Sequence, residues 1–327
     1  MQIIPEKLKA GDVVRIVAPS SSMGIISDAN IAIANDRFKQ LGLVVTFGAG
    51  VKEMDDVQSS SIATRVADLN AAFADSTVKA IFAVIGGFNC NQLLRSLDWD
   101  VIRKNPKIFI GYSDITALQN AMLAKTGLVT YSGPAYSTFG QKLYFEYTLD
   151  YFKKCLMSDE PFEIRPSPTW TDDQWYLDQD NRVLMPNDGW WQIAAGEAEG
   201  DIMGGNLCTL NLLQGTEYFP DISNSILFLE DDEETDYKHF DRDLESLLSV
   251  PAASTIKGIV IGRFQKKSGV AKAMIERLIA IRPYLKDIPI VANANFGHTS
   301  PIFTFPIGGV AKLRVATDGI FCAITKH

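Results

Sequence analysis

The stretch KIFIGYSDITAL (residues 107–118) decides the fold class, because it joins a short apolar run to the start of a helix. Residues 108–110 have the length and composition of a buried strand. Ser113 and Asp114 are residue types that commonly begin helices. A strand that passes through a tight turn into a helix is the building unit of parallel sheets. The stretch therefore predicts an α/β fold, and it raises the question of whether Ser113 caps a helix or presents a reactive hydroxyl.

The same alternation of strand and helix patterns extends outward from this stretch over residues 1–140. DVVRIVAP (12–19) and KAIFAVIGG (79–87) are predicted strands, and the periodic residues 27–42 are a predicted helix. Such alternation indicates a parallel sheet with helices on both faces. Ligands of these sheets bind at the carboxyl ends of the strands. Three strand ends are thus candidates for a site: APSSS (18–22), IGGFN (85–89) and GYSD (111–114).

The pattern changes after residue 140. Residues 167–193 are rich in Trp, Asp, Asn and Pro, with turn signals at QDN and PNDG. We interpret residues 141–185 as a linker and loop insertion. Residues 186–327 mix strand and helix patterns and end in an apparent antiparallel hairpin, so we expect a smaller α+β domain there. The chain is predicted to consist of residues 1–140, 141–185 and 186–327 as three parts.

Composition excludes several classes of protein. The 327 residues are 46% hydrophobic and 21% charged, which is typical of a globular protein, and the net charge of -8 argues against binding to nucleic-acid polymers. We find neither a signal peptide nor an apolar run long enough for a membrane span, so a cytoplasmic location without membrane contact is expected. The four cysteines form no CxxC pair, so we expect all four to be buried as small apolar residues, with neither a zinc site nor a disulfide framework.

We search for a catalytic base first among the histidines, because the chain has three. His239 lies in a predicted acidic helix, and His327 is the last residue, where we expect disorder. His298 follows a predicted strand and Gly297, a residue that lets the backbone approach a ligand closely. His298 is therefore the candidate base, although a loop histidine can also be purely structural.

Ser113 allows two interpretations. As a helix cap it needs no chemistry. As the nucleophile of a strand–turn–helix elbow, it would use Gly111 for the turn, and the amide of Asp114 would face a developing oxyanion. Gly86 and Gly87 could supply a second amide, since GGFN lacks the patterns of dinucleotide- and phosphate-binding loops.

The run LFLEDDEE (227–234) places five acidic residues after an apolar strand. Glu230 falls at the end of that predicted strand, where a partly buried carboxylate could orient a histidine. The other four acids are interpreted as surface charge.

Five motifs together resemble the LD-carboxypeptidase family of serine peptidases, which includes the microcin C immunity proteins. The motifs are IGGFNCNQLL, IGYSDITAL, GGNLCTLNLLQGT, LFLEDDEE and FGHTSP, in this order along nearly the whole chain. The resemblance implies a Rossmann-like N-terminal domain and a Ser-Glu-His triad divided between two domains. Ser113 would be the nucleophile, Glu230 the orienting acid and His298 the general base, with the amides of Gly87 and Asp114 forming the oxyanion hole. It also implies a homodimer that needs no metal or organic cofactor.

The resemblance leaves two substrates open. One branch of the family removes a terminal D-amino acid from muropeptides; the other, the immunity branch, cleaves the amide of toxic aminoacyl-nucleotide conjugates and so confers antibiotic resistance. The long loop with Trp170 and Trp175 favours the second, because aromatic rings stack on nucleobases. Asn89, two residues after Gly87, is a further candidate for substrate binding. A non-catalytic protein that binds a nucleotide or sugar is the alternative from another class.

Overall fold

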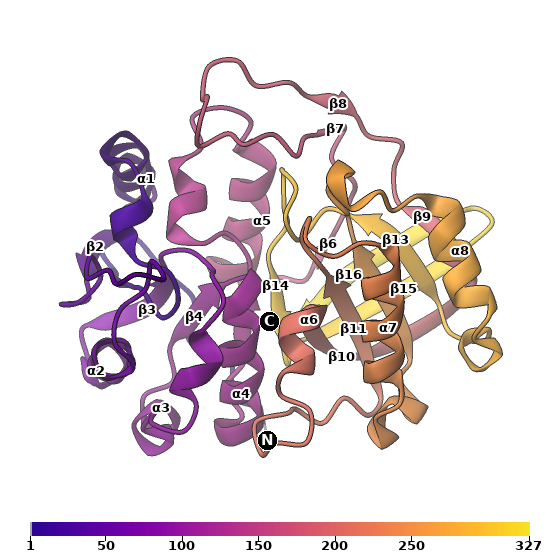
Figure 1. Ribbon diagram of the computed structural model, residues 1–327, viewed down its shortest axis with the longest axis horizontal. Helices are drawn as coiled ribbons and strands as arrows, with labels where there is room; N and C mark the ends of the chain where they lie inside the picture. The colour runs from indigo at the N-terminus through magenta and orange to yellow at the C-terminus, as the bar shows by residue number, and fades with distance from the viewer. Residues whose placement is uncertain (1) are drawn as a thin grey trace.

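The computed structural model describes residues 2–327 and arranges them around two sheets that lie side by side (Figure 1). The N-terminal sheet has the order β14-β5-β4-β3-β1-β2, and its strands are parallel except for β14. Its central strands are buried on both faces, as their continuous apolar runs predict. The strands are β1 (Val13–Val17), β2 (Val44–Phe47), β3 (Val78–Ala83), β4 (Ile108–Gly111), β5 (Thr130–Ser132) and β14 (Phe305–Ile307).

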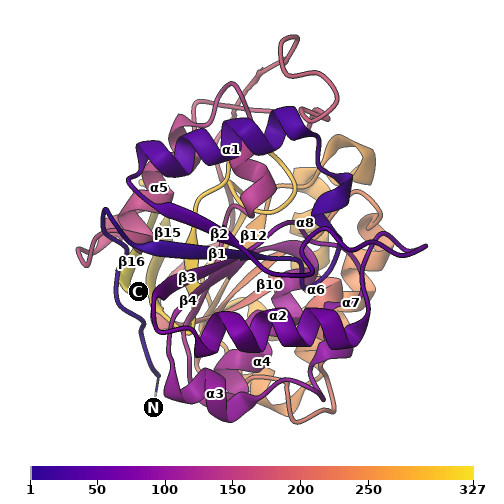
Figure 2. The same cartoon turned by 90° about the vertical axis from the view of Figure 1, so that its left-hand side faces the viewer.

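Helices cover both faces of the N-terminal sheet: α1 and α5 lie on one face, and α2, α3 and α4 lie on the other (Figure 2). Side-chain caps fix where several helices begin, since Ser27 and Ser61 accept hydrogen bonds from the amides of Asn30 and Thr64. The helices are α1 (Asp28–Gln40), α2 (Ile62–Ala74), α3 (Trp99–Lys104), α4 (Thr116–Thr126) and α5 (Glu146–Leu156). This half of the molecule is the predicted parallel α/β sheet.

The C-terminal sheet has the order β6-β16-β15-β10-β11-β12-β13-β9 and is mixed. Strands β10 to β13 are parallel neighbours, whereas β15 and β16 form the predicted antiparallel hairpin. The strands are β6 (Phe162–Glu163), β9 (Trp191–Ala194), β10 (Gly196–Asn206), β11 (Ser225–Glu230), β12 (Gly258–Gly262), β13 (Ile290–Ala294), β15 (Val310–Ala316) and β16 (Gly319–Lys326). The helices are α6 (Leu207–Asn211), α7 (Tyr237–Leu248) and α8 (Lys272–Ala280).

Short elements lie in the connections. A small antiparallel pair, β7 (Thr169–Trp170) and β8 (Met185–Pro186), lies at the base of the long loop that arches over the junction between the two sheets (Figure 1). The 3₁₀ helices are η1 (Met23–Ile25), η2 (Cys90–Leu93), η3 (Ser113–Ile115), η4 (Tyr136–Gly140), η5 (Pro251–Thr255), η6 (Lys266–Ser268) and η7 (Pro283–Leu285).

Helix α4 joins the two sheets. The amide of Asn206, at the end of β10, donates to Thr116 Oγ1 over 2.9 Å, and Asn120 Nδ2 donates to the Gly204 carbonyl over 2.8 Å. Gly205 has a φ of +119°, and a Cβ there would lie 2.5 Å from Thr116 Oγ1. Glycine is therefore required for the contact that places the start of α4 against the C-terminal sheet.

The structure departs from the predicted division of the chain at two points. Residues 141–185 are not only linker and loop, because they contain helix α5 and strand β6, the latter paired with β16. Strand β14 comes from the C-terminal third of the chain but completes the N-terminal sheet by pairing with β5. The sequence pattern missed these exchanges because two- and three-residue strands carry no periodicity.

Two expectations about single residues were wrong. His327 is 6% exposed, since its ring nitrogens contact Lys7 Nζ and the carbonyls of Cys155 and Glu160, so the chain end is held in place. Cys208 is exposed on α6, while the other three cysteines are buried as expected. Within residues 2–327, no helix is long and apolar enough to cross a membrane.

Candidate active site

Ser113 lies in a strained turn between β4 and α4. Its φ is +65°, a left-handed conformation that costs a residue with a side chain roughly 1–2 kcal/mol. A Cβ on Gly86 would lie 2.9 Å from Ser113 Cβ, so only glycine leaves room for the serine side chain there. Helix α4 begins at Thr116 without a side-chain cap, and Ser113 caps no helix. The strain instead turns the hydroxyl toward the C-terminal sheet.

Three residues that are distant in sequence form one chain of hydrogen bonds. His298 Nε2 lies 3.0 Å from Ser113 Oγ, and His298 Nδ1 lies 2.7 Å from Glu230 Oε2. Ser113 follows β4 of the N-terminal sheet, whereas Glu230 ends β11 and His298 follows β13 of the C-terminal sheet. The carboxyl ends of parallel strands from both sheets therefore meet at this point, as the position of ligand sites in such sheets predicts.

The carboxylate of Glu230 occupies a space made by two glycines. Glu230 is 2% exposed. A Cβ on Gly297, whose φ is +98°, would lie 2.6 Å from Glu230 Oε2, and one on Gly262 would lie 2.7 Å from Glu230 Cβ. Sequence reasoning used Gly297 only as a sign of close approach and missed Gly262, although the glycine that ends strand β12 was visible in IKGIVIGRF.

The electrostatics of the site depend on the acidic run after β11. Burial lowers the pKa of His298, but attraction and hydrogen bonding to Glu230 together with the charges of Asp232 and Asp231 outweigh burial and raise that pKa to about 9. Asp231 was expected on the surface and is instead 1% exposed, with Oδ1 accepting from Asn206 Nδ2. Burial, followed by repulsion from Glu230, raises the pKa of Asp231 to about 7. The active site therefore contains a second buried carboxyl group, that of Asp231, next to Glu230.

The two amides predicted for an oxyanion hole lie on loops that one carboxylate ties together. Asp114 Oδ2 accepts hydrogen bonds from Ser20 Oγ (2.5 Å) and from the amides of Asn89 and Cys90 (both 2.9 Å). The three strand ends singled out in the sequence are therefore joined at this residue. A Cβ on Gly87 would lie 2.3 Å from Ser20 Oγ, so glycine is needed for its loop to pass beside APSSS.

A cavity of about 340 Å³ opens beside His298. Tyr112 and Gly297 line it together with Trp175 from the long loop. Trp170 does not line this cavity; its ring instead packs 4.8 Å from the guanidinium of Arg263. Asn89 also lies outside the lining, and its Oδ1 accepts from Arg65 Nη1 over 2.9 Å. Of the three residues predicted to bind substrate, only Trp175 reaches the cavity beside the histidine.

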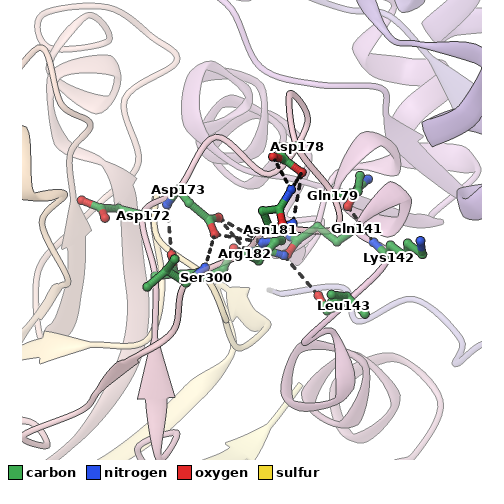
Figure 3. Close-up of polar contacts among 12 residues, drawn as sticks. Gln141, Lys142, Leu143, Asp172, Asp173, Asp178, Gln179, Asn181, Arg182 and Ser300 are labelled. Atoms are coloured by element: carbon green, nitrogen blue, oxygen red, sulfur yellow. Dashed lines mark hydrogen bonds and ion pairs between the residues drawn. The ribbon is translucent and has the colours of Figure 1, made fainter.

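The loop that carries Trp175 is anchored by Arg182, which sequence reasoning overlooked (Figure 3). Arg182 Nε donates to both carboxylate oxygens of Asp173, over 3.0 and 3.1 Å. Its Nη1 donates to Gln141 Oε1 (3.0 Å) and to the Leu143 carbonyl (3.1 Å). The residue is 8% exposed. An arginine within QDNRV gave no sign of burial, because its partners lie up to 41 residues away in sequence.

Comparison with known proteins identifies the family of this chain. Residues 14–133 match the LD-carboxypeptidase N-terminal domain, and residues 199–313 match the LD-carboxypeptidase C-terminal domain. The chain belongs to the LD-carboxypeptidase family. It is 53% identical to "Putative carboxypeptidase YocD" of Bacillus subtilis (strain 168), over 98% of this chain and 99% of that protein. It is 32% identical to the "Probable murein peptide carboxypeptidase" of the same organism, over 95% and 92% of the two chains.

Solved structures of this family share the fold over the whole chain. An MccF-like protein from Bacillus anthracis (strain Ames) has a TM-score of 0.98 at 52% identity, covering 99% of this chain and 100% of that one. The microcin C7 self-immunity protein MccF in complex with aspartyl sulfamoyl adenosine has a TM-score of 0.86 at 27% identity, covering 99% of each chain. Membership of this peptidase family makes the chain a serine-type hydrolase and disfavours the non-catalytic binding protein considered above.

Proposed function

We propose that this protein is a serine peptidase that hydrolyses an amide bond with Ser113 as nucleophile, His298 as general base and Glu230 as orienting acid. The hydrogen-bonded chain from Ser113 through His298 to Glu230 is the observation that carries the proposal. In its neutral form His298 takes the proton of Ser113 while Oγ attacks the amide carbonyl. The carbonyl π electrons move onto oxygen, and the amides of Gly87 and Asp114 are proposed to stabilise that oxyanion.

The remaining steps return the enzyme to its starting state. The tetrahedral intermediate collapses, the C–N bond breaks, and His298 gives its proton to the leaving nitrogen. Water then attacks the acyl-serine ester, giving its proton to His298, and the C–O bond to Ser113 breaks as the serine regains the proton. Glu230 remains ionised throughout and stabilises the imidazolium.

For the substrate we propose an aminoacyl-nucleotide conjugate cleaved at its acyl–nitrogen bond. Trp175 lines the cavity beside His298, where an indole ring can stack on a nucleobase for roughly 1–3 kcal/mol. The similarity over the whole chain to MccF bound to aspartyl sulfamoyl adenosine supports this choice. Trp170 and Asn89 lie outside the cavity lining, so direct contact of either with the substrate remains a prediction. A homodimer in the cytoplasm likewise remains a prediction.

The second candidate is an L,D-linked muropeptide tetrapeptide. It is supported by the 32% identity to a probable murein peptide carboxypeptidase over most of both chains. The same serine, base and acid would release the terminal D-amino acid, and Trp175 would then only pack against the peptide.

A paired hydrolysis assay distinguishes the candidates. Wild type and Ser113→Ala are incubated with aspartyl sulfamoyl adenosine and with an L,D-tetrapeptide, and the products are quantified by mass spectrometry. Serine-dependent cleavage of the first alone, with KM raised about 10-fold or more by Trp175→Ala, is the expected result. Serine-dependent cleavage of the tetrapeptide alone would replace it with the second candidate, and cleavage of neither would overturn the proposed function.

A further inference from the structure

The active-site cavity carries an excess of negative charge. Five acids line it, while no lysine or arginine does, within the described chain. They are Asp172, Asp173, Asp232, Glu233 and Glu234. Each substrate discussed above contains at least one anionic group, so this lining needs an explanation.

Three of the five acids are neutralised from outside the cavity. Asp172 pairs with Lys266 (3.4 Å) and Glu233 pairs with Lys267 (3.1 Å). Asp173 pairs with Arg182 (2.9 Å). These ion pairs hold the walls of the cavity, and their acids are already committed to cations of the protein.

Asp232 and Glu234 are different. Neither forms an ion pair with any residue between positions 2 and 327. One oxygen of Asp232 accepts from the amide of Glu234 (2.9 Å), which fixes the turn that carries both carboxylates. They follow Glu230 by two and four residues, so the same strand end that presents the acid to His298 also presents them to the cavity.

Two residues of the cavity lining each have a side-chain oxygen without a hydrogen-bond partner in the described chain. Thr299, the residue after His298, is 4% exposed, and its Oγ1 has no hydrogen-bond partner in the described chain. Gln265 also lines the cavity, and its Oε1 is buried without a partner there. Unpaired buried oxygens are costly, so a ligand that donates hydrogen bonds would relieve them. Ionised carboxylates and a carbonyl oxygen together form a set of acceptors suited to an ammonium group, which has three donors and no acceptor.

We propose that Asp232 and Glu234 bind an ammonium group on the acyl part of the substrate, so that the enzyme selects cationic aminoacyl groups. The inference rests on the proposed amide hydrolysis at Ser113. A side-chain carboxylate on the acyl group, as in an aspartyl conjugate, would meet like charge at this position, so the aspartyl conjugate should be cleaved more slowly than the lysyl conjugate. The ammonium could be the α-amino group of an unblocked aminoacyl conjugate or the side-chain amine of a diamino acid.

Four sulfamoyl adenosine conjugates separate these sources. The lysyl conjugate carries both ammonium groups, the norleucyl conjugate only the α-ammonium, the 6-aminohexanoyl conjugate only the terminal one, and the hexanoyl conjugate neither. We expect kcat/KM for at least one singly charged conjugate to exceed that for hexanoyl by about 10-fold or more. Whichever ammonium source gives the gain identifies the group that the carboxylates bind.

Variants then test the two residues. Asp232→Asn and Glu234→Gln should each reduce that preference by about 10-fold, and Glu234→Gln should leave kcat/KM for the hexanoyl conjugate within about 3-fold. Glu276→Gln, on the exposed face of α8, is the matched control and should leave the preference unchanged. Equal rates for charged and uncharged conjugates, or a preference that survives both variants, would overturn the inference.

Binding to the Ser113→Ala variant, measured by titration calorimetry with the lysyl and hexanoyl conjugates, separates this inference from the proposed function. Tighter binding of the lysyl conjugate without hydrolysis by wild type would retain the ammonium site and reject the reaction. Serine-dependent hydrolysis without any charge preference would retain the proposed reaction and reject the ammonium site. Failure of both binding and hydrolysis would reject both.

Discussion

The two walls of the active-site cavity are built in different ways. The reactive wall is His298, which lines the cavity after β13, with the two residues hydrogen-bonded to it: Ser113 after β4 and Glu230 at the end of β11. Backbone strain and glycine contacts set its geometry. The opposite wall is the loop that carries Asp172 to Tyr176, and side-chain bonds from Arg182 hold it. The reactive wall is thus fixed by the two sheets, whereas the loop can vary without disturbing them.

This contrast implies that substitutions in the two walls change different quantities. On the reactive wall, a change should reduce the rate of the chemical step or the stability of the fold. On the loop wall, a change should alter substrate binding while the chemical step continues. Five predictions test this division, beginning with the largest expected effect.

Glu230→Gln should reduce kcat by about 10³–10⁴-fold, because a neutral amide neither fixes the histidine tautomer nor stabilises the imidazolium. The substitution preserves volume within the pocket formed by Gly262 and Gly297, so any fall in the thermal midpoint at neutral pH should come from the lost attraction to protonated His298 and not from packing. Steady-state kinetics and calorimetric unfolding of the purified variant measure both. A kcat within about 10-fold of wild type would show that Glu230 is not the orienting acid.

The pH dependence of the reactive wall should be steep. His298 acts as a base in its neutral form, and its pKa is raised to about 9, so kcat/KM should rise by about 10-fold per pH unit until it levels off near pH 9. Because attraction to Glu230 is the largest of the effects that raise this pKa, Glu230→Gln should move the plateau to lower pH. An unchanged profile in that variant would contradict the assignment of the base.

Stability should change with pH in the opposite direction. A folded-state pKa above the unfolded value means that the unfolded chain loses its proton first, so stability falls as pH rises between the two values. For His298 this interval runs from its ordinary 6.5 to about 9, and for Asp231 from 3.8 to about 7. Urea unfolding at several pH values should show the fall, and Asp231→Asn should flatten its lower part. A stability that rises over pH 4–7 would contradict the burial of Asp231.

The sequence predicted the reactive wall better than the loop wall for a physical reason. Ser113, Glu230 and His298 each lie at or just after the end of an apolar strand, and ligand sites in parallel sheets lie at the carboxyl ends of the strands. In the sequence, Gly297 indicated a close approach of the backbone, and Gly86 was a candidate amide donor. By contrast, Asp231 and Arg182 are polar residues buried by partners remote in sequence, and no local pattern distinguishes them from surface charge. The pairing of β14 with the N-terminal sheet was missed for another reason, because a strand of three residues carries no periodicity.

Gly297→Ala should destabilise the fold by about 2–4 kcal/mol, since it combines a left-handed φ with a contact on the carboxylate of Glu230. Gly11→Ala is the matched control: its φ is +95° against +98°, but nothing lies within 4 Å of the added Cβ. The two variants are compared by their free energies of unfolding, measured with denaturant. The difference gives the cost of the contact with Glu230 separately from the cost of backbone strain. Equal losses in the two would mean that Glu230 can move aside, and kcat would then decide whether it remains functional.

Arg182→Lys should have the smallest effect, and that effect should be confined to the loop wall. A lysine ammonium cannot bond Asp173, Gln141 and the Leu143 carbonyl at once as the planar guanidinium does, so the loop with Trp175 loses its fixed position (Figure 3). We expect KM to rise by about 10-fold, with kcat unchanged within about 2-fold. Arg314→Lys, which removes an exposed arginine–aspartate pair with Asp318, is the control and should change neither value. A fall in kcat rather than a rise in KM would show that the two walls act as one unit, because the loop would then be positioning the reacting groups themselves.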